Sequence, residues 1–286
     1  MIIDKLFSDY MKEKKYLQNV SEATIRYYTK AFKFFIQYTS IEEVEEITKP
    51  RLDKFLVTLR EHGKTPENIN CIIKGVNPFL AWLSRNEYIP LYKLKELQTN
   101  KKVQEAYTDA ELKKIISFKP RLFEEHRLYA LLLTLIDTGA RISELLKLEK
   151  DQLDLEHMLI ALTGKGKSRV VPISFELRKV LFKYLERKEI RYSKLVFPSR
   201  RGSEMYYQDI HFQMKNLLES LRIPVKGFHA FRRKFARNYL KNGGNIFYLM
   251  RSMGHSKITT TQRYLEVDTD ELQEAHLKTS LLSRLR

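Results

Sequence analysis

The stretch GHSKITTTQRY, Gly254–Tyr264, is the part of the sequence from which fold and function are best inferred. It places His255 nine residues before Tyr264. Other basic groups precede it: Arg141 in TGARISEL, Lys165 in TGKGKSRVVPI, and His229 with Arg232 in HAFR. One tyrosine among sixteen carries little information, but the order and spacing of the whole set indicate a phosphate-handling site with a tyrosine nucleophile.

Cleavage of a phosphodiester needs a nucleophile, positive charge beside the non-bridging oxygens, and a proton for the leaving oxygen. A tyrosine supplies the nucleophile and holds a covalent intermediate. Arginine suits the oxygens because its planar guanidinium makes paired hydrogen bonds and stays charged. Lysine or histidine can donate the proton. We expect no cofactor and no metal, because the sequence has neither a GxxxxGK[ST] loop nor a cysteine–histidine cluster.

Two of the segments have an ordinary alternative. Arg141 follows a predicted helix break and lies three residues before Glu144, whose carboxylate can orient the guanidinium; the alternative is a surface Arg–Glu pair. Lys165 lies between two glycines in the turn of a predicted β-hairpin, from which its ammonium could reach a leaving oxygen. The alternative is a non-specific phosphate contact, which is the role predicted for Lys167 and Arg169.

The later groups are also ambiguous when taken singly. His229 and Arg232 lie three residues apart and project from one face of a predicted helix, as surface charges often do. His255 follows a glycine helix stop, and a lone histidine is usually structural. Tyr264 lies in a polar stretch, where the alternative is a partly buried packing tyrosine. The combination of the groups carries the prediction.

With this ordered set the sequence resembles the tyrosine recombinase (phage integrase) family, especially its short Xer-type and transposon-resolvase-like members. The shared pattern is a TGxRxxE box, a lysine in a glycine-rich hairpin turn, HxxR, and GH followed nine residues later by tyrosine. The resemblance covers nearly the whole chain. Two departures, Phe231 for a common leucine and Arg233 for a common histidine, fall outside the catalytic positions.

The resemblance implies a mainly α fold with a small β-hairpin or sheet. An N-terminal helical, SAM-like core-binding domain and a C-terminal mixed α/β catalytic domain would form a C-shaped DNA clamp. We predict the boundaries as 1–98 for the first domain, 99–106 for a linker, and 107–286 for the catalytic domain with a C-terminal interaction tail.

The resemblance also implies a mechanism. Tyr264 would attack the scissile phosphate and form a 3′-phosphotyrosyl link, while Lys165 protonates the leaving 5′-hydroxyl. Arg141 and Arg232 would hold the non-bridging oxygens. A partner strand's 5′-hydroxyl then reverses the step, through a Holliday junction. His229 and His255 would hydrogen-bond the phosphate and help to move or position the tyrosine proton. Glu144 would support the site by orienting an arginine.

The implied partner is double-stranded DNA with an inverted-repeat core site, bound by a homotetramer on two sites, with a second recombinase or accessory proteins as a further option. The leucine-rich tail at 268–286 could dock on a neighbour or pack on its own domain. The chain length favours a role in resolving dimers or cointegrates over one that needs an arm-binding domain, with integration or excision of a mobile element still open.

Composition agrees with a polyanionic partner. Lys and Arg number 52 and Asp and Glu 35, a formal net charge of +17. Residues 1–103 carry a net +5 and residues 104–286 a net +12, so both halves are basic. The single cysteine excludes an internal disulfide. No apolar run reaches the ~20 residues of a membrane span and the start lacks a signal-peptide pattern, so we expect a cytoplasmic protein without a membrane partner.

Helical periodicity predicts the secondary structure. In the first half we expect four helices and a short fifth: 2–15, 22–38, 48–63, 65–85 and 91–97. In the second half we expect a capping-box helix from Thr108, an apolar helix at 127–137, a hairpin of 158–163 and 169–173, and further helices at 175–187, 207–221, 229–242, 245–253 and 257–266.

Two other functions fit part of the pattern. A type IB topoisomerase uses similar chemistry but relaxes supercoils without a required site. A DNA-binding regulator with a decayed active site would bind without cleaving, although the complete set of catalytic residues argues against decay. Base-reading residues cannot be named from the sequence. Arg200 and Arg201 are DNA-contact candidates, as is the helix predicted at 65–85.

Overall fold

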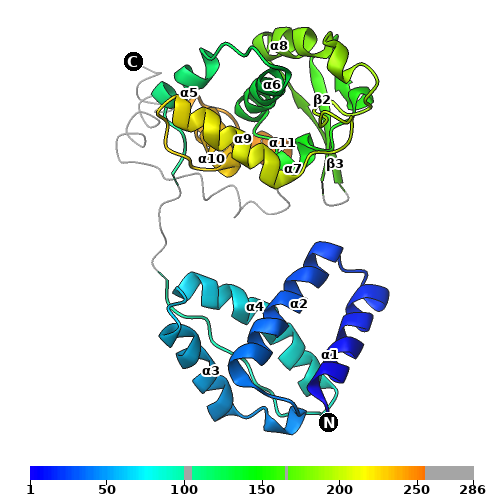
Figure 1. Ribbon diagram of the computed structural model, residues 1–286, viewed down its shortest axis with the longest axis vertical. Helices are drawn as coiled ribbons and strands as arrows, with labels where there is room; N and C mark the ends of the chain where they lie inside the picture. The colour runs from blue at the N-terminus through cyan, green and yellow to red at the C-terminus, as the bar shows by residue number, and fades with distance from the viewer. Residues whose placement is uncertain (100–104, 165–166, 255–286) are drawn as a thin grey trace, which may run out of the picture. The chain divides into compact units, whose positions relative to one another are not determined.

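The computed structural model describes residues 1–99, 105–164 and 167–254. The chain divides into two compact units, Met1–Lys102 and Val103–Arg286 (Figure 1). It is mostly helical, with one small antiparallel sheet in the second unit.

The first unit is a helical bundle. Its α-helices are α1 (Ile3–Lys12), α2 (Glu22–Thr39), α3 (Lys49–Glu61) and α4 (Pro66–Arg85). A π-helical turn, Glu13–Leu17, extends α1, and a 3-10 turn, Val44–Glu46, precedes α3. Ser21 and Thr65 cap α2 and α4 with their side-chain oxygens, which accept hydrogen bonds from the main-chain nitrogens of Thr24 and Asn68. Apolar faces of all four helices form one core that includes Phe35, Phe55 and Phe79.

The prediction of a short fifth helix at 91–97 is wrong. This segment has no regular secondary structure, because its main-chain groups bond to two asparagines of α4. The Asn77 amide exchanges hydrogen bonds of 2.9 and 3.0 Å with Leu94, and the Asn70 amide bonds of 2.7 and 2.8 Å with Leu97. A helix would need those same groups for itself.

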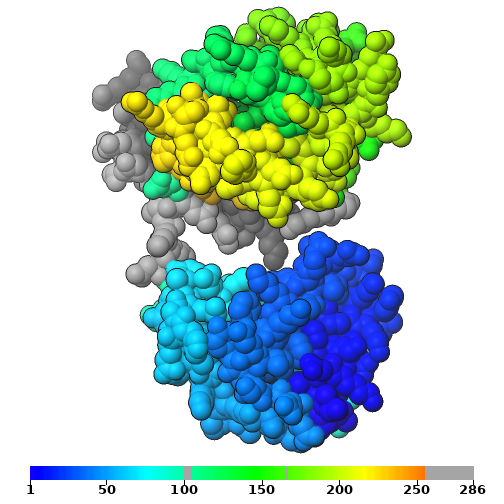
Figure 2. Space-filling model, in the orientation of Figure 1, coloured from blue at the N-terminus to red at the C-terminus, as the bar shows by residue number. Residues whose placement is uncertain are grey.

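The second unit packs helices around α6 (Phe123–Thr138), whose leucines lie in the core together with residues of the sheet and of neighbouring helices. The confirmed capping box of Thr108 and Glu111 starts α5 (Asp109–Ile116). The other α-helices are α7 (Ile142–Leu145), α8 (Phe175–Leu185), α9 (Tyr207–Ser220), α10 (Phe228–Lys241) and α11 (Ile246–Met253). Figure 2 shows α9 on the surface of this unit, and Figure 1 shows α6 running through its middle.

The predicted hairpin is confirmed. Strand β2 (Leu159–Gly164) pairs antiparallel with β3 (Lys167–Pro172), with Gly164 opposite Lys167. A short strand missed by the sequence prediction, β1 (Leu153–Asp154), completes the order β1-β2-β3. The hairpin turn itself, residues 165 and 166, lies outside the described residues, as do the predicted helix 257–266 and the tail.

Candidate active site

Arg141 and Glu144 begin the site at the end of α6. Gly139 ends that helix with a φ of 61°, a conformation that favours glycine, and Arg141 then caps α7. The main-chain nitrogen of Arg141 donates to Glu144 Oε2 and its Nη1 to Oε1, both at 2.8 Å. The Glu144 side chain is only 1% exposed, against 28% for Arg141. The pair is therefore not the ordinary surface pair that the sequence left open.

Arg169 contacts the same carboxylate. Its Nη1 and Nη2 donate to Glu144 Oε1 and Oε2 at 2.7 and 2.8 Å, a bidentate ion pair, and its Nε donates to the Ser252 carbonyl at 2.5 Å. The side chain is 10% exposed. The role of Arg169 as a phosphate contact stays a prediction, and in this structure its guanidinium binds Glu144 and Ser252. The alternation of side chains along β3 could have indicated this inward position, because Arg169 lies on the same side of the strand as the buried Val171.

These contacts set the charge state of Glu144. Burial alone would raise the pKa of its carboxyl group, but hydrogen bonds and charges from Arg169 and Arg141 outweigh burial and lower the pKa to about 2. Glu144 is therefore a carboxylate under all physiological conditions. It offsets part of the positive charge of the two arginines while holding their guanidinium planes.

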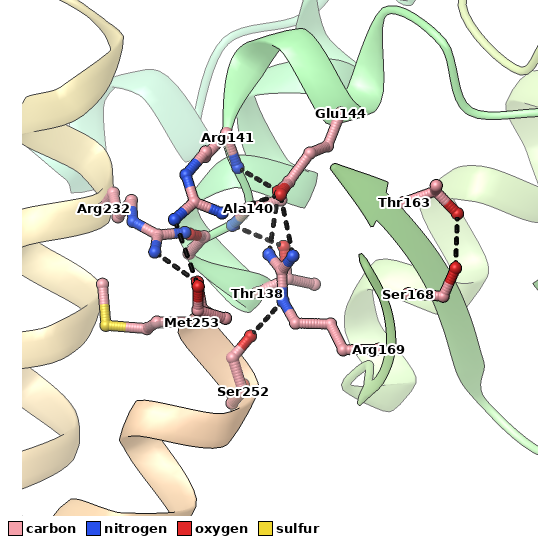
Figure 3. A network of polar contacts seen from close by, with 12 residues as sticks. Thr138, Ala140, Arg141, Glu144, Thr163, Ser168, Arg169, Arg232, Ser252 and Met253 are labelled. Atoms are coloured by element: carbon pink, nitrogen blue, oxygen red, sulfur yellow. Dashed lines mark hydrogen bonds and ion pairs between the residues drawn. The ribbon is translucent and has the colours of Figure 1, made fainter. Parts of the chain in front are cut away.

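Arg232 lies on α10 and is 3% exposed. Its Nη1 donates to the Gly139 carbonyl at 2.7 Å and its Nη2 to the Met253 carbonyl at 2.5 Å. Arg232 thus links the break after α6 to the end of α11. This placement brings it beside Arg141, as Figure 3 shows.

Three arginines meet three consecutive carbonyls at the C-terminus of α11. The Ser252 carbonyl accepts from Arg169 and the Met253 carbonyl from Arg232 (Figure 3). The Gly254 carbonyl accepts from Arg141 at a longer distance of 3.4 Å. The last carbonyls of a helix lack partners within the helix and carry the negative end of its dipole, so guanidinium groups are favourable there. The arrangement fixes the point at which the chain continues to His255.

His229, three residues before Arg232 on α10, is exposed. Although the residue is exposed, partial loss of hydration lowers the pKa of its imidazole below the usual value. The neighbouring positive charges of Arg232, Arg233 and Arg141 lower it further. The ring is therefore mainly neutral near pH 7. A neutral imidazole can both donate and accept a hydrogen bond, as a group that handles a tyrosine proton needs to do.

The other predicted residues fall into two groups. Lys165, His255 and Tyr264 lie outside the described residues, one or more peptide bonds beyond Gly164 and Gly254. Lys167 is exposed at the start of β3, a position that leaves its predicted DNA contact open.

Arg200 and Arg201 are exposed in a turn elsewhere in the second unit. Arg200 pairs with Glu124, and both arginines line a pocket of about 390 Å³ that also contains Arg127 and Gln213. Of the predicted catalytic residues that the structure describes, Arg141, His229 and Arg232, none lines this pocket, so it is separate from the arginine cluster.

The two departures from the family pattern contact the first described residues of the second unit. Phe231 is fully buried and stacks on Tyr107 with ring centroids 4.3 Å apart. Arg233 donates from Nε and Nη2 to the Glu105 carbonyl at 2.9 and 2.7 Å. The segment that enters this unit is therefore held on α10, the helix that carries His229 and Arg232.

Among residues 1–99, 105–164 and 167–254, no group of three or more His, Cys, Asp or Glu side chains is placed to hold a metal ion. Across the same described residues, no helix is both long and apolar enough to cross a membrane.

Comparison with known proteins agrees with this geometry. The model of the phage integrase family matches residues 105–271. Tyrosine recombinase XerA of Pyrococcus horikoshii is 30% identical over 274 residues, which cover 94% of this chain and 92% of the relative. Tyrosine recombinase XerC of Bacillus pumilus is 26% identical, with 95% and 94% covered.

Solved structures show the same fold. The Tn1549 transposon integrase in complex with transposon right end DNA superposes with a TM-score of 0.81 at 18% identity, covering 97% of this chain and 99% of that one. XerH site-specific recombinase bound to a palindromic difH substrate superposes with a TM-score of 0.75 at 20% identity, covering 94% of this chain and 83% of that one. The chain therefore belongs to the phage integrase family, as an enzyme of the tyrosine recombinase class.

Proposed function

We propose that this protein is a site-specific DNA recombinase that cleaves and rejoins strands through a 3′-phosphotyrosyl intermediate. Tyr264 attacks the scissile phosphate and Lys165 protonates the leaving 5′-oxygen. Arg141 and Arg232 hydrogen-bond the non-bridging oxygens, which carry the charge that develops in the transition state. The 5′-hydroxyl of a partner strand then attacks the phosphotyrosine, so the bond energy is conserved and four such steps pass through a Holliday junction.

The observation that carries this proposal is the placement of Arg141 and Arg232 side by side at the end of α11 (Figure 3). Each guanidinium is oriented by acceptors of the protein, the first by Glu144 and the second by two main-chain carbonyls. Pre-oriented donors lower a barrier because they need not reorganise as charge develops. Gly254, whose carbonyl accepts from Arg141, is the first residue of the GH…Y segment, and His255 follows it.

The remaining catalytic groups have supporting roles in this proposal. His229 and His255 hydrogen-bond the phosphate and guide the tyrosine proton, and the neutral state of His229 fits that task. Glu144 holds Arg141 without contacting the substrate.

We further propose that residues 1–98 form the core-binding domain and 107–286 the catalytic domain, joined by the linker 99–106, and that both close on one duplex as a C-shaped clamp. The net positive charge of both parts of the chain supports this, since phosphate contacts dominate non-specific affinity for DNA.

Four protomers would assemble on two inverted-repeat sites. The biological role we propose is resolution of dimers or cointegrates, or movement of a mobile element; the Tn1549 structure, a transposon integrase in complex with transposon right end DNA, supports the second.

Covalent-adduct capture tests the proposal. The wild type and Tyr264→Phe are expressed in the source cell, denatured without crosslinker and purified, and the attached DNA is sequenced. We expect adducts only in the wild type, all at one position between inverted arms. Adducts at many sites would instead indicate a topoisomerase, and equal adducts in both proteins would exclude Tyr264 as the nucleophile. A nicked duplex that traps the adduct repeats the test in vitro, and DNA binding without adducts there would indicate a regulator.

A further inference from the structure

The Glu144–Arg169 ion pair lies between two glycines that directly precede predicted catalytic residues. A Cβ built on Gly164 would lie 2.6 Å from Glu144 Oε1, and one built on Gly254 would lie 3.1 Å from Arg169 Nη1. Gly254 also has a φ of 63°, which L side chains rarely adopt. A side chain at Gly164 would displace the carboxylate, and one at Gly254 would crowd the guanidinium.

Each glycine is one peptide bond from a group that the proposed reaction needs. Lys165 follows Gly164 in the hairpin, and His255 follows Gly254 at the end of α11. Arg169 is connected to both places. It lies on β3, where it pairs with Leu162 of β2, and its Nε holds the Ser252 carbonyl of α11. The ion pair is therefore the shared support of two segments that are 90 residues apart in sequence.

We infer that Arg169 is a positioning residue that, through Glu144, fixes the hairpin lysine and the histidine–tyrosine segment relative to Arg141. This inference rests on the proposed function. Arg169 does not touch the substrate in this role. It sets the positions of Gly164 and Gly254, the residues that directly precede Lys165 and His255 in the chain, and in this way couples the general acid and the nucleophile to one phosphate site.

The role requires arginine because three of its nitrogens are used in fixed directions. Nη1 and Nη2 grip both oxygens of Glu144 while Nε reaches the carbonyl of Ser252. A lysine keeps the charge but offers a single ammonium that cannot reproduce this fork. A phosphate contact, in contrast, would largely survive such a change, because lysine is also a good phosphate binder as a point charge.

Arg169→Lys therefore separates the two roles. Cleavage is measured as a single-turnover rate constant on a nicked duplex carrying the site recovered by adduct capture, and affinity as the Kd for that duplex. We expect the Kd to stay within about twofold while the rate constant falls on the order of 10²-fold, a loss typical of slight misplacement of reacting groups. An unchanged rate constant, with or without a weaker Kd, would overturn the inference. The control is Arg187→Lys, which alters an arginine paired with Glu189 outside the site at 3.0 Å.

Amide hydrogen exchange without DNA gives a readout that does not depend on the reaction. We expect Arg169→Lys to speed exchange in both β2–β3 and the end of α11, with α8 unchanged. Faster exchange in one segment only would overturn the coupling, and faster exchange throughout the second unit would show a merely structural role. Gly164→Ala, which disturbs the same carboxylate from the hairpin side, should reproduce the pattern if Arg169→Lys does not fold. If the wild type itself cleaves no DNA, the proposed function fails, while the exchange data still decide whether the pair couples the two segments.

Discussion

Arg232 Nη2 donates a 2.5 Å hydrogen bond to the carbonyl oxygen of Met253, the last residue of α11. Its Nη1 reaches the Gly139 carbonyl, which follows α6. One buried side chain therefore joins the ends of two helices and, in the proposed reaction, presents charge to the phosphate. Because one guanidinium serves both purposes, replacing Arg232 should affect both DNA cleavage and the stability of the second unit.

Arg232→Lys should abolish adduct formation while leaving duplex affinity within a few-fold of the wild type. The ammonium keeps the charge but cannot span two carbonyls and a phosphate together. Loss of a buried charged hydrogen bond should also lower the free energy of unfolding of the second unit by about 1.5–3 kcal/mol. A nicked DNA substrate and thermal unfolding test the two effects. Adduct formation by Arg232→Lys at the wild-type rate would exclude Arg232 from the phosphate site. The control variant, Arg187→Lys, should form adducts at the wild-type rate.

Glu144 should titrate far below an ordinary glutamate. Its pKa is lowered to about 2 from an ordinary value of 4.5, so the ionised carboxylate stabilises the folded state. That stability is complete above pH 4.5 and is lost as pH falls towards 2, and it amounts to about 3 kcal/mol. Carboxyl ¹³C titration, with the resonance assigned by its absence in Glu144→Gln, measures the pKa. A midpoint near 4.5 would mean that the two arginine pairs do not persist in solution.

Local sequence signals predicted most of the fold. The capping box of Thr108, the break at Gly139 and the hairpin strands depend on residues that are close in the sequence, and all are present. The Arg141–Glu144 contact is of this kind too, at a spacing of three residues.

Contacts between distant segments could not be predicted in the same way. The stretch at 90–99, which has no regular secondary structure, depends on α4 side chains up to 27 residues away, and the Arg169–Glu144 pair spans 25 residues. A basic residue after a glycine-rich turn is typical of a phosphate contact, and only the folded position of Glu144 shows another use for Arg169. The long-range partners of Arg232 and Arg233, likewise, have no counterpart in sequence spacing.

Lys165→Ala should slow cleavage far more on a normal substrate than on one with a 5′-bridging sulfur. A thiolate is a good leaving group and needs no proton, so loss of the general acid matters little there. Removal of a general acid typically costs about 10²–10⁴-fold on the oxygen substrate. Single-turnover cleavage of matched nicked duplexes gives both rate constants. An equal loss on the two substrates would remove Lys165 from this role, and Lys167→Ala, the neighbouring change, should weaken binding alone.

Arg233→Ala should loosen the entry of the second unit while sparing catalysis. Arg233 adjoins Arg232, and its Nε and Nη2 donate to the Glu105 carbonyl, beside the stack of Phe231 on Tyr107. We expect faster amide exchange at residues 105–108, a loss of roughly 1 kcal/mol in stability, and a cleavage rate constant within about threefold of the wild type. Arg232→Lys should give the opposite pattern, with cleavage abolished and less change at 105–108. If Arg233→Ala slows cleavage as strongly as Arg232→Lys, the prediction is wrong. The contact between Arg233 and Glu105 would then also orient α10, and through α10 the active-site residues that contact the phosphate.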